Sequence, residues 1–477
     1  MTGGLPSRPG LAGGPVYLDS VGLEDPAGPR CAPTSEPLHR PARTTLAKAG
    51  RTARATRTKE TAMTHVALPE PTTGTIVRAV TQRRILTVLV CSQILSGAGL
   101  AAGVTVGALL AQNMLGTTSL AGLPSALFTA GSALAAVAVG RLSNARGRRP
   151  GLAAGYLTGA LGSIGVIAAA ALGNPVLLFA ALFVYGAGTA TNLQARYAGA
   201  DLADPARRAR AIATVLVATT LGGVVGPNLA APTGALAERL GLPPLTGLFL
   251  LSGAAYALAA VVLAVWLRPD PLLLARAEAA ATTATTNATD SPAGPGPGLR
   301  LGVLVMVLTQ LVMVAIMTMT PVHLHAHGHG TAAAGLVIAL HIAAMYLPSP
   351  LTGRLVDRYG ARPLAAASAG TLLAAGLVAA TASGGSVAPL AAALALLGIG
   401  WNLGLVAGTT LITDAVPLAT RAKTQGAVDV AIAIAGTTGG MGSGLVVAAA
   451  GYPALALAGG ILALLILPAV AAAARRT

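Results

Sequence analysis

Charged and aromatic side chains are scarce in this sequence. Of its 477 residues, 10% are Asp, Glu, Lys or Arg and 3% are Phe, Trp or Tyr, whereas 54% are hydrophobic. Soluble domains carry about a quarter charged residues, so this composition excludes an ordinary soluble fold and predicts a membrane protein. The two cysteines, Cys31 and Cys91, are far apart in the chain, which excludes a disulfide framework and a cysteine metal site.

Residue patterns of enzymes and of nucleic-acid-binding proteins are missing as well. The net charge of +16 would indicate nucleic-acid binding only if the basic residues formed a folded face with aromatic or polar side chains between them to contact the bases. No such pattern is found. The sequence has no nucleophile beside a base, no carboxylate pair, no phosphate-binding loop with its lysine and no zinc motif. We therefore expect neither an enzyme nor a nucleotide-driven pump, and no cofactor, resident metal or nucleic-acid partner.

Uncharged apolar runs recur after Arg84, each about twenty residues or longer, which is the length needed to cross a bilayer. In lipid only helices and closed barrels leave no backbone amide unpaired, and these runs lack the alternation of barrel strands. The sequence therefore predicts an all-α membrane protein with twelve transmembrane helices. They lie near residues 85–111, 118–139, 151–172, 175–196, 211–233, 244–267, 301–322, 332–353, 364–382, 387–412, 424–448 and 452–473.

Arginine and lysine collect in every second gap between these runs. Of the 31 such residues, only Arg239 falls in a gap of the other set. Because a Lys and Arg bias in short loops marks the cytoplasmic side, we expect a multi-pass plasma-membrane protein with both termini in the cytoplasm. The alternation also supports an even number of helices independently of hydropathy.

Two polar stretches flank the apolar segments. Residues 1–83 are rich in Pro, Gly, Thr and Arg, which predicts a disordered basic tail. Part of this tail resembles a transit peptide, and the other interpretation is that translation starts at Met63. Residues 268–300 are a cytoplasmic linker between six-helix bundles at 84–267 and 301–477.

One short turn occurs twice, six helices apart. GRLSNARGRRP at 140–150 matches GRLVDRYGARP at 353–363 in the spacing of Gly, Arg, Leu, Gly, Arg and Pro. The repeat indicates an internal duplication of two parallel halves, an arrangement found in secondary transporters.

These turns resemble the loop motif of the major facilitator superfamily, and the resemblance spans residues 84–475. It implies that the turns form a cytoplasmic gate in which an acid meets the amino end of a helix in the opposite half. Asp357 is that acid in the second copy, whereas Asn144 replaces it in the first, so we expect a weaker first latch. The other interpretation is that both turns only anchor the topology. The motif residues are Gly140, Arg141, Asn144, Arg146, Gly147, Arg148, Gly353, Arg354, Asp357, Arg358, Gly360 and Arg362.

A second stretch, GGVVGPNLAA at 222–231, is similar to a motif of facilitators that export drugs in exchange for protons. Gly222 and Gly226 allow a close helix approach, and Pro227 bends the helix. Alanines stand where the motif ends in two glycines, and Leu182 stands where such exporters carry an arginine. The alternative interpretation is close packing alone.

Two titratable residues within the predicted spans are candidates for proton coupling. His341 lies near the middle of the eighth span and fits either proton handling or an interhelical hydrogen bond. Asp429 lies near the cytoplasmic end of the eleventh span, where it fits coupling, capping of its own helix, or pairing with Arg421 or Arg196. Arg196 and Asp201 we assign to the gate.

Polar residues on the first, fourth, seventh and tenth helices, which line the central path in the superfamily, are candidates for the substrate cavity; either packing or bridging between helices would also explain them. They are Gln93, Asn192, Gln194, Gln310, Trp401 and Asn402. A tryptophan face beside an amide suits a flat or weakly cationic molecule. Four histidines, His323, His325, His327 and His329, fit either a site for Zn²⁺, Ni²⁺ or Cu²⁺ or solvated loop side chains.

Together these features predict a monomeric secondary transporter that exports a small organic compound or drug by proton-coupled alternating access. One alternative is an importer or uniporter of a small metabolite with the same fold. An alternative of another class is a membrane sensor that does not transport.

Overall fold

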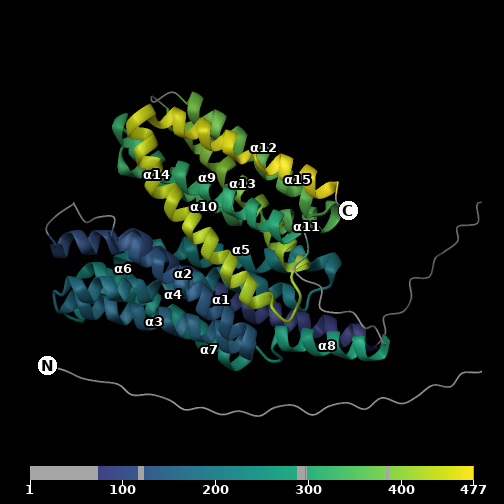
Figure 1. The fold of residues 1–477 in the computed structure, drawn as a ribbon. Coiled ribbons are helices and arrows are strands. Elements are labelled where there is room, and N and C mark those ends of the chain that lie inside the picture. The colour runs from purple at the N-terminus through teal and green to yellow at the C-terminus, as the bar shows by residue number, and fades with distance from the viewer. Residues whose placement is uncertain (1–72, 116–122, 287–295, 297, 383–385, 476–477) are drawn as a thin grey trace, which may run out of the picture. The chain divides into compact units, whose positions relative to one another are not determined.

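The computed structural model describes residues 73–115, 123–286, 296, 298–382 and 386–475, all of which belong to one compact unit, Glu70–Thr477. Every regular element in these residues is a helix (Figure 1). Most of the predicted tail, with Met63 and Cys31, lies outside the described residues.

The first half of the described chain contains long helices joined by short turns. Its elements are α1 (Thr73–Leu115), α2 (Leu123–Arg146), α3 (Arg148–Ala171), α4 (Pro175–Asp201), the short 3₁₀ helix η1 (Pro205–Arg207), α5 (Arg208–Asn228), α6 (Ala230–Arg239), the 3₁₀ helix η2 (Pro244–Thr246), α7 (Gly247–Trp266) and α8 (Pro271–Thr286).

The second half follows a similar order of long helices. Its elements are α9 (Gly298–Ala326), α10 (Thr331–Tyr346), α11 (Ser349–Tyr359), α12 (Ala361–Thr381), α13 (Val387–Ala415), α14 (Arg421–Ala463) and α15 (Ile466–Ala474).

Each predicted apolar run overlaps one or two of these helices. Within the described ranges, nine helical stretches are long and apolar enough to cross a bilayer, and the last of them covers 54 residues, Arg421–Ala474. α14 is interrupted at Gly451, whose φ of 83° is not helical, and Pro453 follows it. The 54-residue stretch therefore consists of two segments that meet at this glycine.

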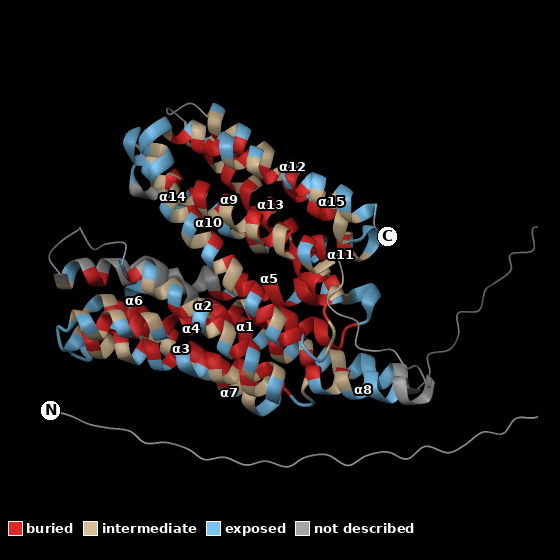
Figure 2. Ribbon diagram, in the orientation of Figure 1, coloured by how far each residue is buried: buried red, intermediate tan, exposed pale blue. Residues whose placement is uncertain are grey.

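Helices pack through small residues and expose large apolar ones. A Cβ added at Gly162 of α3 would lie 2.4 Å from the backbone nitrogen of Tyr185 in α4. Leu161 and Ile164, elsewhere on α3, are exposed. Figure 2 shows that buried, intermediate and exposed residues occur along the same long helices. This pattern suits lipid, where close backbone approach stabilises helix pairs and apolar side chains face the hydrocarbon.

The repeated turn contains a glycine with the same backbone conformation in both copies. Gly147 has φ of 96° and Gly360 has φ of 89°, a region that L side chains rarely adopt. Gly147 separates α2 from α3, and Gly360 separates α11 from α12. The glycine repeat in the sequence therefore reflects a backbone requirement at both turns.

α1 begins at Thr73, before the boundary at residue 83 that the composition predicts for the tail. The polar side chains in its first turns have partners in the bundle: Gln82 Nε2 donates to the carbonyl of Gly199 at 2.8 Å, and Arg78 donates to that of Leu202 at 3.3 Å. These carbonyls stand at the carboxyl end of α4, where backbone acceptors lack helical partners. Hydropathy alone misses such an extension.

Candidate transport cavity and gate

The second copy of the turn joins the two halves of the chain through Asp357. Its Oδ1 accepts from the backbone N–H of Ala209 at 2.9 Å, and its Oδ2 accepts from Arg210 N at 3.3 Å and Arg210 Nε at 2.7 Å. Ala209 and Arg210 lie in the first turn of α5, where free amides and the helix dipole favour a carboxylate. A Cβ at Gly353 would lie 2.9 Å from the carbonyl oxygen of Ala209, so glycine permits this approach.

The first copy makes a different contact, to a helix in the linker. Asn144 accepts two hydrogen bonds from Arg276 of α8, at its carbonyl oxygen (2.8 Å) and at Oδ1 (2.9 Å). The same guanidinium donates to the carbonyls of Leu418 and Ala419 at 3.0 Å each. Arg276 therefore bridges the α2–α3 turn and the α13–α14 turn, which belong to opposite halves.

The linker also supplies an acid to the first turn. Asp270 Oδ2 accepts from Arg149 N at 2.7 Å, at the amino end of α3, and Oδ1 accepts from Leu272 N at 3.0 Å in α8. A Cβ at Gly147 would lie 2.4 Å from Asp270 Oδ2. Asp270 thus caps two helix termini at once.

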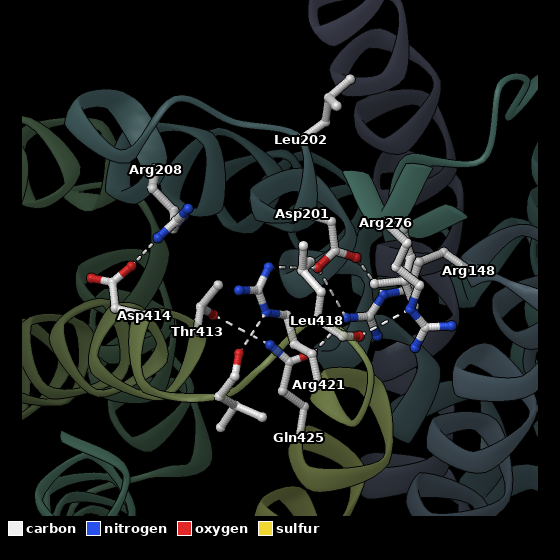
Figure 3. A network of polar contacts seen from close by, with 12 residues as sticks. Arg148, Asp201, Leu202, Arg208, Arg276, Thr413, Asp414, Leu418, Arg421 and Gln425 are labelled. Atoms are coloured by element: carbon white, nitrogen blue, oxygen red, sulfur yellow. Dashed lines mark hydrogen bonds and ion pairs between the residues drawn. The ribbon is translucent and has the colours of Figure 1, made fainter. Parts of the chain in front are cut away.

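Arg148 is the buried centre of the gate. Its side chain is fully buried, and its Nε lies 2.7 Å from Asp201 Oδ2 at the end of α4. Its Nη2 donates to Gln425 Oε1 of α14, and Arg421 Nη1 lies 3.9 Å from Asp201 Oδ1 (Figure 3). Because this cluster joins α3 and α4 to α14, it holds the halves together at the end that carries the repeated turns.

The remaining arginines of the motif lie outside this cluster. Arg141, Arg146, Arg354 and Arg358 are exposed, while Arg362 is half-buried. This placement suits a role in topology for the four exposed residues. A further ion pair across the halves joins residues that the sequence did not single out, Arg208 and Asp414 (Figure 3).

We expect Arg276→Ala to loosen the gate end, because it removes four hydrogen bonds from a cation to oxygen acceptors on both halves. A hydrogen bond to a charged group contributes about 2 kcal/mol net of the exchange with water. Amide hydrogen exchange over residues 416–424 should speed up in this variant. Arg239→Ala, an exposed site near the end of α6, is the control. Equal exchange in both variants would contradict the bridging role.

A cavity of about 710 Å³ lies among α2, α4, α9 and α14. Its wall is mostly apolar, and among the described lining residues Asp429 alone carries a charge. The lining residues are Leu123, Ala126, Phe128, Thr129, Ser132 and Ala136 of α2, Thr189, Ala190 and Leu193 of α4, Gln310, Val314 and Thr318 of α9, and Asp429, Ile432, Ala433, Gly436, Thr437, Gly440 and Met441 of α14.

Asp429 forms an ion pair across the halves at the wall of this cavity. Its Oδ1 lies 2.8 Å from Arg196 Nη2 and 3.3 Å from the Tyr197 hydroxyl, both on α4. Arg196 is fully buried and Asp429 is 5% exposed. Asp429 Oδ2 has no hydrogen-bond partner within the described ranges. A buried carboxylate oxygen without a donor is costly, so this atom is ready to accept a proton or a ligand donor.

The ion pair lies between the cavity and the gate. Asp429 follows Arg421 by eight residues, which is about 12 Å along α14. The other lining residues of α14 follow Asp429 and extend to Met441, away from the gate. A change at Asp429 is therefore placed to reach both the cavity and the contacts between the two halves.

Of the six predicted cavity residues, Gln310 lines this cavity. Its Oε1 accepts from Trp401 Nε1 of α13 at 2.8 Å, and the indole packs edge-on against the ring of Tyr346 with centroids 5.5 Å apart. Trp401 itself is not part of the described lining. It acts on the cavity by holding the amide of Gln310.

Two of the six lie in a polar network inside the first half. Gln93 Oε1 accepts from the Tyr156 hydroxyl at 2.6 Å, and Gln93 Nε2 donates to Thr219 Oγ1 at 3.1 Å. Asn192 Nδ2 donates to Ser96 Oγ at 2.9 Å. This network joins α1, α3, α4 and α5, and these amides lie outside the described cavity lining.

Two more of the six also bridge helices. Gln194 Nε2 donates to the carbonyl of Ala136 in α2 at 2.7 Å. Asn402 accepts from Thr352 Oγ1 at 2.6 Å and donates to Ser349 Oγ at 2.7 Å. Both amides are fully buried and outside the described lining.

The histidines lie away from the cavity. His341 is fully buried, and its Nδ1 lies 2.8 Å from the carbonyl oxygen of Leu394 in α13. Of the two interpretations, proton handling and an interhelical hydrogen bond, this contact fits the hydrogen bond. The rings of His323 and His327 have centroids 4.3 Å apart, and His323 stacks on Tyr452. Among the described residues no group of three or more His, Cys, Asp or Glu is arranged for a metal ion.

Gly222, in the motif similar to that of exporters, is a point of close contact between α5 and α1. A Cβ there would lie 2.2 Å from the carbonyl oxygen of Ile94 and 2.6 Å from Ala98 N. α5 ends at Asn228, directly after Pro227, and α6 begins at Ala230. The side chains of Gly226 and Pro227 lie outside the described residues.

We expect Gly222→Leu to destabilise the protein, because the backbone of α1 leaves no room for a side chain. Overpacking of this kind costs about 1–3 kcal/mol or more. The fraction of monodisperse protein after heating in detergent measures this. Gly370→Leu is the matched control, since nothing lies within 4 Å of a Cβ there. An equal loss in both variants would show that hydrophobic bulk, and not the helix contact, is responsible.

Several gate residues were not predicted from the sequence. Asp270 and Arg276 lie in the linker, where α8 forms. Asp270 had a readable signal, since an acid directly before Pro271 marks a helix start. Arg276 and Gln425 carried no signal in the sequence, because each forms hydrogen bonds with residues far away in the chain.

The sequence is similar to that of a known protein family. The sequence profile described as Major Facilitator Superfamily matches residues 88–348 and 302–477. The chain belongs to the Major Facilitator Superfamily. It is 57% identical over 392 residues to the "Uncharacterized MFS-type transporter YdeG" of Bacillus subtilis, covering 81% of this chain and 91% of that protein. It is 30% identical over 353 residues to "Riboflavin transporter RfnT" of Brucella anthropi, covering 74% and 86%.

Solved structures show the same fold at low sequence identity. The human organic anion transporter MFSD10 superposes with a TM-score of 0.67 at 17% identity, covering 82% of this chain and 99% of that one. The proton:xylose symporter XylE superposes with a TM-score of 0.63 at 17% identity, covering 82% and 95%. The family and the candidate spans of the described residues together make this protein a multi-pass membrane transporter of small molecules.

Proposed function

We propose that this transporter exports a small organic compound in exchange for protons by alternating access. Its twelve helices form two six-helix halves, at 84–267 and 301–477, joined by the linker 268–300, and both termini face the cytoplasm at the plasma membrane. The paired turns at 140–150 and 353–363 support the duplication. The observation that carries the coupling is the Arg196–Asp429 pair at the cavity wall.

The charge distribution supports this orientation. The arginines of both turns, together with Arg208 and Arg210, gather at the gate end, which the positive-inside rule assigns to the cytoplasm. The contacts through Asp357, Arg148 and Arg276 close that end in this conformation. The cavity, on the far side of Asp429, then faces the outside.

Proton exchange fits the surroundings of Asp429. The groups that act on its carboxyl are Arg196, Tyr197 and, from farther away, Arg148. A proton on Oδ2 removes the negative charge that pairs with Arg196 and converts an acceptor into a donor. A ligand donor and a proton therefore compete for the same oxygen. In the conformation open to the outside, an arriving proton displaces the compound, which is the order an exporter requires.

Purified protein in liposomes tests this proposal. A pH-sensitive dye is trapped inside, and a panel of lipophilic amines, neutral antimicrobials and riboflavin is added outside. We expect substrate-dependent proton movement, which His341→Ala should retain because His341 hydrogen-bonds to α13 outside the described cavity lining. Loss of the signal in this variant would move the coupling site to His341.

Other outcomes separate the alternatives. Movement of compounds without a dye response would favour a uniporter. Movement of riboflavin alone would favour a metabolite transporter, as the name of the relative RfnT suggests. No movement across the panel would favour the sensor and overturn the proposal.

A further inference from the structure

The mostly apolar wall of the cavity carries hydrogen-bonding groups that have no partner among the described residues; Thr189 Oγ1 is one, and two others are an acceptor on Asp429 and a donor on Gln310. Asp429 Oδ2 is an acceptor without a partner among the described residues, on a side chain that is 4% exposed. Gln310 is half-buried; its Oε1 accepts from Trp401, and its Nε2 has no hydrogen-bond partner among the described residues. Buried polar groups are normally paired, so the unpaired oxygen of Asp429, with a free donor farther along the same wall, indicates where a ligand binds.

Trp401 fixes which end of the Gln310 amide is available. Because the indole N–H donates only, the atom that it contacts at 2.8 Å is the amide oxygen. The NH₂ group is then left for a ligand. It lies beside α14, since a Cβ built at Gly436, another lining residue, would be 3.3 Å from Gln310 Nε2.

The position of Gly436 sets the distance between the two groups. Gly436 follows Asp429 by seven residues on α14, which is about 10 Å along the helix. The lining residues between them are Ile432 and Ala433, both apolar. Beyond Gly436 the wall continues to Met441, and Phe128 of α2 supplies an aromatic ring.

We propose that the cavity binds an elongated amphiphilic amine: an ammonium group on Asp429, an apolar middle, and a hydrogen-bond acceptor about 10 Å away on Gln310. This inference rests on the proposed function and adds the class of substrate. A positively charged donor is favoured because Asp429 is the one charged residue of the described lining and Arg196 lies buried behind it. The volume of about 710 Å³ fits one such molecule.

Trp401 provides a direct reading of occupancy. The chain has two tryptophans, and Trp266 is 51% exposed. Trp266→Phe therefore leaves a single indole, whose N–H is bonded to the amide that binds the ligand. The probes are N-benzoyl-α,ω-diaminoalkanes of increasing chain length, in which the carbonyl is the acceptor, the ammonium is the donor and the phenyl ring can reach Phe128.

We expect the affinity, measured from Trp401 emission, to peak at the chain length that separates carbonyl and ammonium by about 10 Å. Trimethylating the ammonium removes its N–H donors and should weaken binding about tenfold or more. Gln310→Met should remove the length preference while retaining weaker binding. Thr381→Val, at the exposed end of α12, is the control and should keep both the affinity and the preference.

Three results would overturn this substrate class: equal affinity at all lengths, equal binding of the trimethylated probes, or no response of Trp401 to any probe. Misfolding of Gln310→Met does not affect the test, because the length series is read on the protein with native cavity residues. Binding with the expected length preference but no transport would instead contradict the proposed function. Transport of the panel without the length preference would contradict this inference alone.

Discussion

Replacing Asp429 with asparagine should abolish proton-driven accumulation of substrate while leaving substrate exchange intact. Asparagine retains an oxygen that accepts from Arg196 Nη2, 2.8 Å away in the native protein, but it cannot take up a proton. A pH gradient of one unit supplies about 1.4 kcal/mol, so it sustains at most about a tenfold accumulation per proton exchanged. In Asp429→Asn the ratio of inside to outside substrate should fall to about one.

The measurement is uptake into proteoliposomes with and without an imposed pH gradient, beside exchange of labelled for unlabelled substrate without a gradient. Glu238→Gln, an exposed acid on α6, removes the same charge elsewhere and should accumulate substrate normally. Asp429→Ala adds a stability comparison, because it leaves Arg196 buried without its partner, a change that costs about 3–5 kcal/mol. Full accumulation by Asp429→Asn would remove Asp429 from the coupling mechanism.

Asp357→Ala should shift the protein toward a conformation open at the gate end. The substitution removes two hydrogen bonds to backbone amides of α5 and the ion pair with Arg210. With a contribution of about 2 kcal/mol, the ratio of closed to open protein should fall about thirtyfold. Asn144 cannot compensate, because its acceptors are occupied by Arg276 of the linker helix.

Spin labels at Arg207 and Arg358, both exposed at the gate end, report this change as a longer distance between the halves. The labels are placed after replacement of Cys31 and Cys91 by alanine. Asp204→Ala is the matched control, since Asp204 accepts from Ala206 N within its own 3₁₀ turn. An unchanged distance distribution in Asp357→Ala would show that the other contacts suffice to hold the gate.

The helices and the repeated turns could be predicted from the sequence because their signals are local. A run of twenty apolar residues predicts a helix in lipid, and the glycine that repeats at 147 and 360 is required by a positive φ at both turns. The contact of Asp357 with a helix start could be predicted because Asp357 occupies the acidic position of the repeated turn. For Asp429, its depth in the span is consistent with proton coupling, with capping of its own helix, and with pairing to Arg421 or Arg196; the structure shows the pair with Arg196.

The cavity wall was harder to predict, because a helix surrounded by lipid and protein is apolar on all sides and its rotation is not visible in the pattern. The described cavity is lined by α2 and α14 as well as α4 and α9. Gln93 and Asn402 instead form hydrogen bonds within their own halves. Polar residues in a membrane protein mark either a cavity or a bridge between helices, and the sequence does not separate the two.

The most direct test of the account is whether binding of an amine probe releases a proton. Because the ligand donor requires Oδ2 of Asp429 as an acceptor, binding favours the ionised carboxyl, and the affinity should fall as the pH is lowered. We predict release of about one proton per ligand bound in weakly buffered detergent solution at low pH, and none from Asp429→Asn. Binding by the native protein with no proton released, and with an affinity independent of pH, would contradict exchange of substrate for a proton at this site.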